Sequence, residues 1–184
     1  MFTFPIFPAL PDVRMDGYNN RLHERLTTLL TEYAKVGRQI QNPPTCRRTK
    51  DAEQAIADTD PAKVTFATAG WDTHGYWDAT NNRYTPLDFA GYYRVSAKLS
   101  FTPQTVTTGN RRCAIYRNNT EYSSVTVPQT STLRVVVLCT DLVYLNGASD
   151  YVEIFAICGE ACDIEAEAYR TSFAIEYVGA DQLL

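Results

Sequence analysis

The clearest pattern in the sequence is a strict alternation of apolar and polar residues between Gly91 and Phe101. A period of two is typical of an antiparallel strand with one face in a core and the other in water. We therefore predict a strand in this segment. Its apolar face consists of Tyr93, Val95, Ala97, Leu99 and Phe101, and its polar face of Arg94, Ser96, Lys98 and Ser100.

Further short segments with strand character follow one another from residue 64 onward, separated by turn residues. They lie at 64–67, 76–77, 83–85, 112–116, 122–127, 133–139, 151–157 and 172–178. In 133–139 apolar residues occupy both faces, which predicts a strand that is buried on both sides. Many short strands with regularly spaced turns favour a β-sandwich over a parallel sheet. We predict a mainly β sandwich domain over residues 63–184.

Residues 16–41 show a different pattern, in which apolar residues recur at alternating intervals of four and three. The stripe consists of Leu22, Leu26, Leu29, Tyr33, Val36 and Ile40. This heptad spacing predicts a helix, and so narrow a stripe on a charged helix suits a coiled-coil stalk. Tyr33 needs room in the seam, which favours three strands over two. The alternative is an amphipathic helix packed on its own domain.

The first 15 residues interleave prolines with large apolar residues. Proline fixes φ and lacks a backbone donor, so we predict an extended peptide rather than a helix or a central strand. Its apolar part, formed by Phe2, Phe4, Pro5, Ile6 and Phe7, is typical of a peptide that docks in a groove on another protein. The alternative is a tail packed on its own domain. Residues 42–62 mix prolines and charges around a helix-prone patch at 52–57, and we predict that they form a linker.

Composition narrows the class of protein. The chain has 184 residues, of which 45% are hydrophobic and 21% charged, which is enough for a packed domain with an appendage. The formal net charge of −4 argues against a dedicated nucleic-acid-binding protein. No apolar run approaches the length of a membrane span, and the apolar start lacks the basic segment of a signal peptide. We therefore expect neither membrane insertion nor a secretory leader.

The residues that usually carry chemistry are sparse. The five cysteines are Cys46, Cys113, Cys139, Cys158 and Cys162. Cys113 and Cys139 lie in apolar strands and predict buried free thiols, whereas Cys158 and Cys162 are either a local disulfide or two free thiols. The sequence has only two histidines and none of the common catalytic or phosphate-binding motifs. We predict no enzymatic activity, no metal and no cofactor, with a carboxylate-pair hydrolase as the remaining enzymatic alternative.

Order and spacing between residues 71 and 101 resemble a known family. The segment resembles the complement C1q-type globular head and tumour necrosis factor in the order of its parts. These parts are an aromatic-Asp segment (Trp71–Asp72, then Tyr76–Asp78), a polar turn, a short strand, a Pro-x-x-x-x-Gly loop and a Tyr-rich alternating strand. The segment 172–179 resembles the family's closing strand, with Ile175 where the family has glycine. The resemblance implies a trimeric jelly roll. It places the following residues in the head core or trimer interface: Trp71, Tyr76, Trp77, Tyr93, Phe101, Phe173, Ile175 and Tyr177.

These expectations combine into a fibre-like layout of anchoring peptide (1–15), coiled-coil helix (16–41), linker (42–62) and jelly-roll head (63–184). Secreted animal members of the family carry signal peptides and collagen-like stalks, and neither is predicted here. We therefore expect a homotrimeric structural protein on the surface of a bacteriophage virion. Its N-terminus would bind capsid or tail proteins, and its head would face host-surface glycans or proteins. The alternative is a free-standing trimeric ligand- or glycan-binding module of a bacterium.

Overall fold

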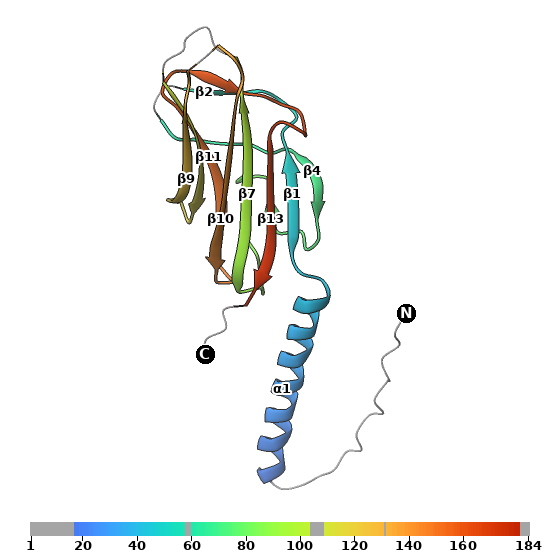
Figure 1. Ribbon diagram of the computed structural model, residues 1–184. Helices are drawn as coiled ribbons and strands as arrows, with labels where there is room; N and C mark the ends of the chain where they lie inside the picture. Colours follow the sequence, from blue (N-terminus) through green and yellow to red (C-terminus); the bar gives the residue numbers. More distant parts are fainter. Residues whose placement is uncertain (1–16, 58–59, 104–108, 131, 181–184) are drawn as a thin grey trace. The chain divides into compact units, whose positions relative to one another are not determined.

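The computed structural model describes residues 17–57, 60–103, 109–130 and 132–180 (Figure 1). The chain divides into two compact units, Met1–Gln41 and Asn42–Leu184, and each is described by itself. The predicted anchoring residues Phe2 to Phe7 lie outside the described part of the chain. Among the residues described, no helix is both long and apolar enough to span a membrane.

The described residues of the first unit form one helix, α1 (Gly17–Gln41), which confirms the helix predicted for this segment. Its apolar stripe is exposed within the single chain. The exposed fractions are 61% for Leu22, 50% for Leu26, 57% for Leu29 and 78% for Tyr33. The side chains of Val36 and Ile40 lie outside the description. Because the free energy falls when apolar side chains leave water, this stripe is a surface that another molecule can cover.

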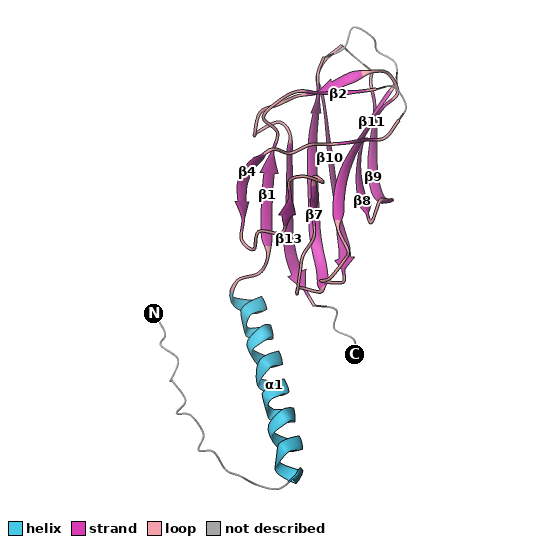
Figure 2. Ribbon diagram, turned by 180° about the vertical axis from the view of Figure 1, so that it is seen from behind, coloured by secondary structure: helices cyan, strands magenta, loops and turns pink. Residues whose placement is uncertain are grey.

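The second unit is a sandwich of two antiparallel sheets, packed face to face in Figures 1 and 2. Sheet A runs in the order β4 (Thr68–Asp72), β1 (Thr45–Thr49), β13 (Ser172–Gly179), β7 (Gly91–Phe101) and β10 (Val135–Leu145), with β12 (Cys162–Ile164) and β2 (Gln54–Ile56) extending from β7. Sheet B runs in the order β5 (Trp77–Asp78), β6 (Arg83–Tyr84), β11 (Val152–Cys158), β8 (Asn110–Arg117) and β9 (Thr120–Pro128), with β3 (Ala62–Lys63) beside β11. The predicted sandwich is confirmed.

The core lies between the sheets and is built from alternate residues of the long strands. Strand β7 has the predicted bounds, and its apolar face, from Tyr93 to Phe101, has no exposed surface. Phe173 of β13 and Ile154 of β11 face the same core. The alternation in the sequence therefore reports one-sided burial, as expected for an antiparallel sheet with one solvated face.

The linker predicted for 42–62 is wrong, because this segment supplies strands β1, β2 and the first residue of β3. Strand β1 pairs with β13 on one side and β4 on the other. Arg48 of β1 and Lys50 are buried, and Arg47 is half-buried. Lys50, just after β1, donates from Nζ to the Oε1 of Gln54 and to both oxygens of Thr65, and Arg48 donates to the carbonyl of Ala67. The helix-prone patch at 52–57 contains β2, and 64–67 is extended chain between β3 and β4 rather than a strand.

The cysteines divide as one disulfide and three free thiols. Cys158 of β11 and Cys162 of β12 are bonded, which settles the pairing that the sequence left open and links sheet B to sheet A. Cys113 and Cys139 are free and buried, as predicted, and so is Cys46. The covalent link therefore holds β12, which pairs with β2 and with the end of β7, to the end of β11 in the other sheet.

The hydrogen bonds around the carboxylate of Asp150 predict that the fold loses stability in acid. Burial by itself raises the pKa of Asp150, but hydrogen bonds from Asn118, Arg117 and the backbone of Asn146 outweigh it and lower the pKa below its usual range. A lowered folded-state pKa stabilises the fold above the unfolded-state pKa of about 4, and this contribution is lost as the pH falls through the folded-state value. Urea midpoints should hold from pH 7 to about 5 and drop below about pH 4. The urea midpoint of the Asp150→Asn variant should fall less in acid. An identical fall in the variant would show that Asp150 is not the source of the acid sensitivity.

Candidate functional site

The outer face of sheet A carries exposed apolar residues on strand β10. Val136, Leu138 and Leu142 are 51%, 60% and 46% exposed, while Val137 and Cys139 on the opposite face are buried in the core. The prediction that 133–139 is buried on both sides is therefore wrong for the single chain. Among the described residues of this domain, the two sheets form two layers, and the outer face of β10 stays partly open to solvent. The apolar second face requires another explanation, such as a surface that a partner covers.

Strand β9 of sheet B extends this apolar surface around the edge of the sandwich. β9 and β10 are the last strands on the same side of their two sheets (Figure 1). Tyr122 and Val125 of β9 are 47% and 38% exposed. The Tyr122 hydroxyl donates to the carbonyl of Leu142 at 3.0 Å, which links the edge strands of the two sheets. We call the surface formed by Tyr122, Val125, Val136, Leu138 and Leu142 the apolar edge.

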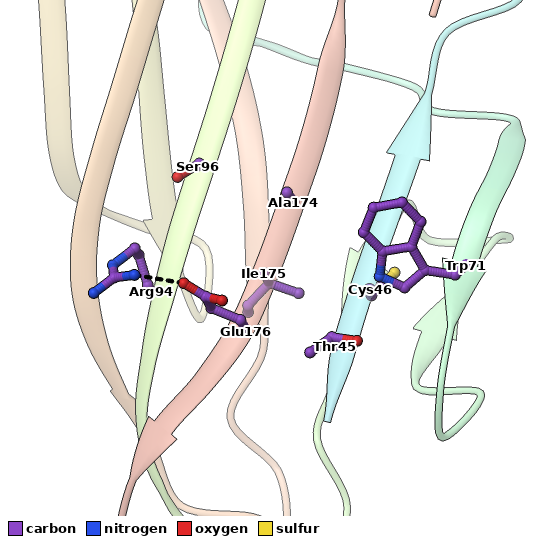
Figure 3. Close-up of a pocket in the computed structure, with 8 residues that line it drawn as sticks. All are labelled: Thr45, Cys46, Trp71, Arg94, Ser96, Ala174, Ile175 and Glu176. Atoms are coloured by element: carbon purple, nitrogen blue, oxygen red, sulfur yellow. Dashed lines mark hydrogen bonds and ion pairs between the residues drawn. The ribbon is translucent and has the colours of Figure 1, made fainter. Parts of the chain in front are cut away.

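The outer face of sheet A is also hollowed, over strands β7, β13, β1 and β4, into a cavity of about 280 Å³ (Figure 3). Four strands supply its lining, which consists of Thr45, Cys46, Trp71, Arg94, Ser96, Ala174, Ile175 and Glu176. The ring of Trp71 lies over β1, and the guanidinium of Arg47 lies 5.8 Å from the centre of that ring. Opposite it, Arg94 Nη1 and Glu176 Oε1 form an ion pair at 2.6 Å.

The cavity offers contact surface rather than a reactive group. Burial, followed by the charge of Asp72, raises the pKa of the Cys46 thiol to about 12, against a lowering influence from Arg48. Since the thiolate is the nucleophile, Cys46 stays protonated and inert at neutral pH. In the described part of the chain, no three His, Cys, Asp or Glu residues are grouped so as to hold a metal ion. The cavity is suited to an apolar or aromatic side chain with a polar neighbour.

The structure brings most of the predicted head residues into one aromatic core. Tyr93, Phe101, Phe173 and Ile175 are buried, and Tyr76, Trp77 and Tyr177 are half-buried against them. Trp77 packs on Phe173 with ring centres 5.3 Å apart, and Tyr93 packs on Tyr177 at the same separation.

Trp71 is the exception, because it is 50% exposed and does not belong to the core. Strand β4 contains an extra residue, Gly70, where the register with β1 shifts between Arg47 and Arg48. Such a bulge changes the side to which the following residue points. The family resemblance alone, from which Trp71 was assigned, does not reveal this bulge. The apolar edge was also missed as a site, although the second apolar face of 133–139 was its signal.

Comparisons with known proteins identify the fold. No protein-family model matches the sequence, and no curated protein is similar enough to match. Among solved structures, murine APRIL matches with a TM-score of 0.59 at 10% identity, covering 74% of this chain and 100% of that chain. Eiger TNF from S. frugiperda matches with a TM-score of 0.60 at 9% identity, covering 77% and 96%. The globular domain of zebrafish complement 1qA protein matches with a TM-score of 0.52 at 12% identity, covering 76% and 98%. The head therefore has a TNF/C1q-like jelly-roll fold, as the resemblance implied.

Proposed function

We propose that this protein is a homotrimeric structural component of a bacteriophage particle. In this proposal residues 1–15 anchor it to capsid or tail proteins, α1 forms a three-stranded stalk, and the jelly-roll heads face outward. The observation that carries the proposal is that both units leave apolar surface uncovered in the single chain, on the stripe of α1 and on the apolar edge of the head.

The two surfaces of the head support a closed ring of subunits. The apolar edge projects where sheets A and B end, while the cavity hollows the outer face of sheet A. Two different patches that contact each other make a heterologous interface, which closes into a ring when the rotation fits. In a three-fold ring, the edge of one copy covers the cavity face of the next. Leu138 and Tyr122 of one head then pack against Trp71 and the Arg94–Glu176 pair of its neighbour.

The helix supports the same number of chains. Leu30, four residues after Leu26, is 63% exposed and adds an e position to the a and d stripe. A stripe that includes e is wider than a two-stranded seam and has room for Tyr33. About three heptads are marginal for isolated association, so the helix and the head would stabilise one trimer together.

The virion setting is supported by the layout of the chain. An apolar, proline-interrupted start is suited to a groove or sheet edge on another protein. A helix with an uncovered stripe followed by a jelly-roll head is the arrangement of a short fibre. A homotrimer needs only one anchoring peptide per chain to attach through three contacts at once, which multiplies the strength of attachment.

The experiment compares the full chain with a variant lacking residues 1–15. Both should sediment at about three times the chain mass of 20.7 kDa. When they are expressed during phage assembly, only the full chain should appear in purified particles. A monomer at micromolar concentration would contradict the trimer. Incorporation of the shortened chain would contradict the anchor, and failure of both chains to incorporate would favour the free-standing bacterial module.

A further inference from the structure

Two of the three free thiols meet in the core between the two sheets. Cys113 lies on β8 of sheet B and Cys139 on β10 of sheet A, and neither has exposed surface. The Sγ of Cys113 lies 3.9 Å from the carbonyl oxygen of Ala97, which is the residue paired with Cys139 between β7 and β10. A hydrogen bond also joins the two thiols directly. We call Cys113 and Cys139 the thiol pair.

The surroundings of the thiol pair make its two members chemically different. Cys139 accepts hydrogen bonds from the thiol of Cys113 and from two further donors, which are the hydroxyl of Ser123 on β9 and the backbone amide of Ile115 on β8. The hydrogen bond from Cys113 has the largest influence, and together the three outweigh burial and lower the pKa of Cys139 to about 7. The same hydrogen bond, followed by burial, raises the pKa of Cys113. One thiol of the pair therefore ionises readily beside another that stays protonated.

The third free thiol, Cys46, provides an internal comparison. It is also buried, but burial, followed by the charge of Asp72, raises its pKa to about 12. It lies on β1, and two strands of sheet A, β13 and β7, separate β1 from β10. Because peroxides oxidise thiolates rather than thiols, we expect Cys139 to react and Cys46 to stay reduced.

We propose that the thiol pair is an oxidation site, at which hydrogen peroxide converts the two thiols into a disulfide between the sheets. The sulfur of Cys139 attacks one peroxide oxygen, the O–O bond breaks, and a sulfenic acid and one water form. The sulfur of Cys113 then attacks the sulfur of Cys139, and the S–O bond breaks as the S–S bond forms. The proton of Cys113 leaves with the displaced hydroxide as a second water. The two thiols lose two electrons, and the peroxide gains them.

The thiol pair lies beside residues of the apolar edge. Leu138 of the edge precedes Cys139 on β10, and Val125 of the edge is paired with Cys113 between β9 and β8. Strands β8 and β10 lie against each other across the core, so a disulfide here would fix the two sheets together at the edge. Because both thiols are buried, the peroxide reaches them only when the edge strands open locally. In this respect alone the inference rests on the proposed function, since a neighbouring head over the apolar edge would slow that opening.

The test counts the cysteines of the full chain that iodoacetamide alkylates after denaturation without reductant. The three free thiols should all be alkylated before treatment with hydrogen peroxide, and only Cys46 afterwards, with a peptide map that joins Cys113 to Cys139. The matched control is Cys46→Ala, which should still form the bond. Cys113→Ala should form no bond and should carry added oxygen on Cys139 instead. Leu138→Asp, which uncovers the edge, should form the bond at least about threefold faster than the natural chain.

The outcomes separate the oxidation site from the proposed assembly. If all three thiols were still alkylated after peroxide treatment, in the natural chain and in Leu138→Asp, the oxidation site would be overturned and the trimer left intact. Equal oxidation of Cys46 would overturn the selectivity of the pair. Added oxygen on Cys139 of the natural chain, without a joined peptide, would overturn the disulfide. A joined peptide that forms equally fast in the natural chain and in Leu138→Asp would support the oxidation site and contradict the covering of the apolar edge by a neighbouring head.

Discussion

Replacing Leu138 by aspartate should dissociate the heads of the proposed trimer without unfolding them. Leu138 is 60% exposed on the outer face of β10, so a carboxylate there remains in water in the single chain. In the proposed ring the same position is covered by the next head, and an unpaired buried charge costs several kcal/mol. We expect the association of the full chain to weaken by at least about a hundredfold, equivalent to about 2.7 kcal/mol.

The measurement is sedimentation equilibrium over a dilution series, with near-ultraviolet circular dichroism to confirm that the head is folded. Leu87→Asp is the matched control, because Leu87 is 49% exposed and lies in the loop before β7 rather than on the apolar edge. It should associate like the natural chain. A trimer of unchanged affinity in Leu138→Asp would show that the apolar edge is not an interface. An equal loss in Leu87→Asp would show that the effect is not specific to the edge.

Strands β7 and β1 show how far the sequence predicts the fold. β7 has eleven residues of unbroken alternation, so its bounds, faces and core residues could all be predicted. β1 has the sequence TCRRT, and its two arginines favour a solvated segment. It becomes a strand because β13 and β4 bind its backbone on both sides and because the guanidinium of Arg48 packs over Trp77. These partners are distant in sequence, and strand propensity gives way to such tertiary contacts.

The candidate site was predictable in part for a related reason. The apolar stripe of α1 and the second apolar face of β10 are both visible in the sequence. Apolar character alone does not distinguish burial by the same chain from burial by another copy, so β10 was assigned to the interior. Trp71 was assigned to the core or the trimer interface, and it lies outside the core because a single added residue, Gly70, changes the register of β4 with β1. Alternation predicts faces only where the register is continuous.

The aromatic core supplies a second prediction, in which two large aromatic residues should differ sharply in their effect on stability. Phe173 has no exposed surface, and its ring lies 6.0 Å from that of Phe66 and 5.3 Å from that of Trp77. Phe173→Ala removes these contacts and leaves a cavity between the sheets, so the free energy of unfolding should fall by about 3–5 kcal/mol. Trp71→Ala removes a half-exposed ring and its contact with Arg47, which should cost no more than about 1 kcal/mol.

Both substitutions should be measured by urea unfolding in the Leu138→Asp background, because dissociated heads report the fold rather than the assembly. The dependence of the unfolding free energy on urea should stay constant, so a shift in midpoint reports stability alone. In the trimeric background Trp71→Ala should instead weaken association, since Trp71 lines the cavity that the neighbouring edge covers. Equal costs for Phe173→Ala and Trp71→Ala in the dissociated head would place Trp71 in the core. If Trp71→Ala did not affect association, the cavity would not be part of the interface.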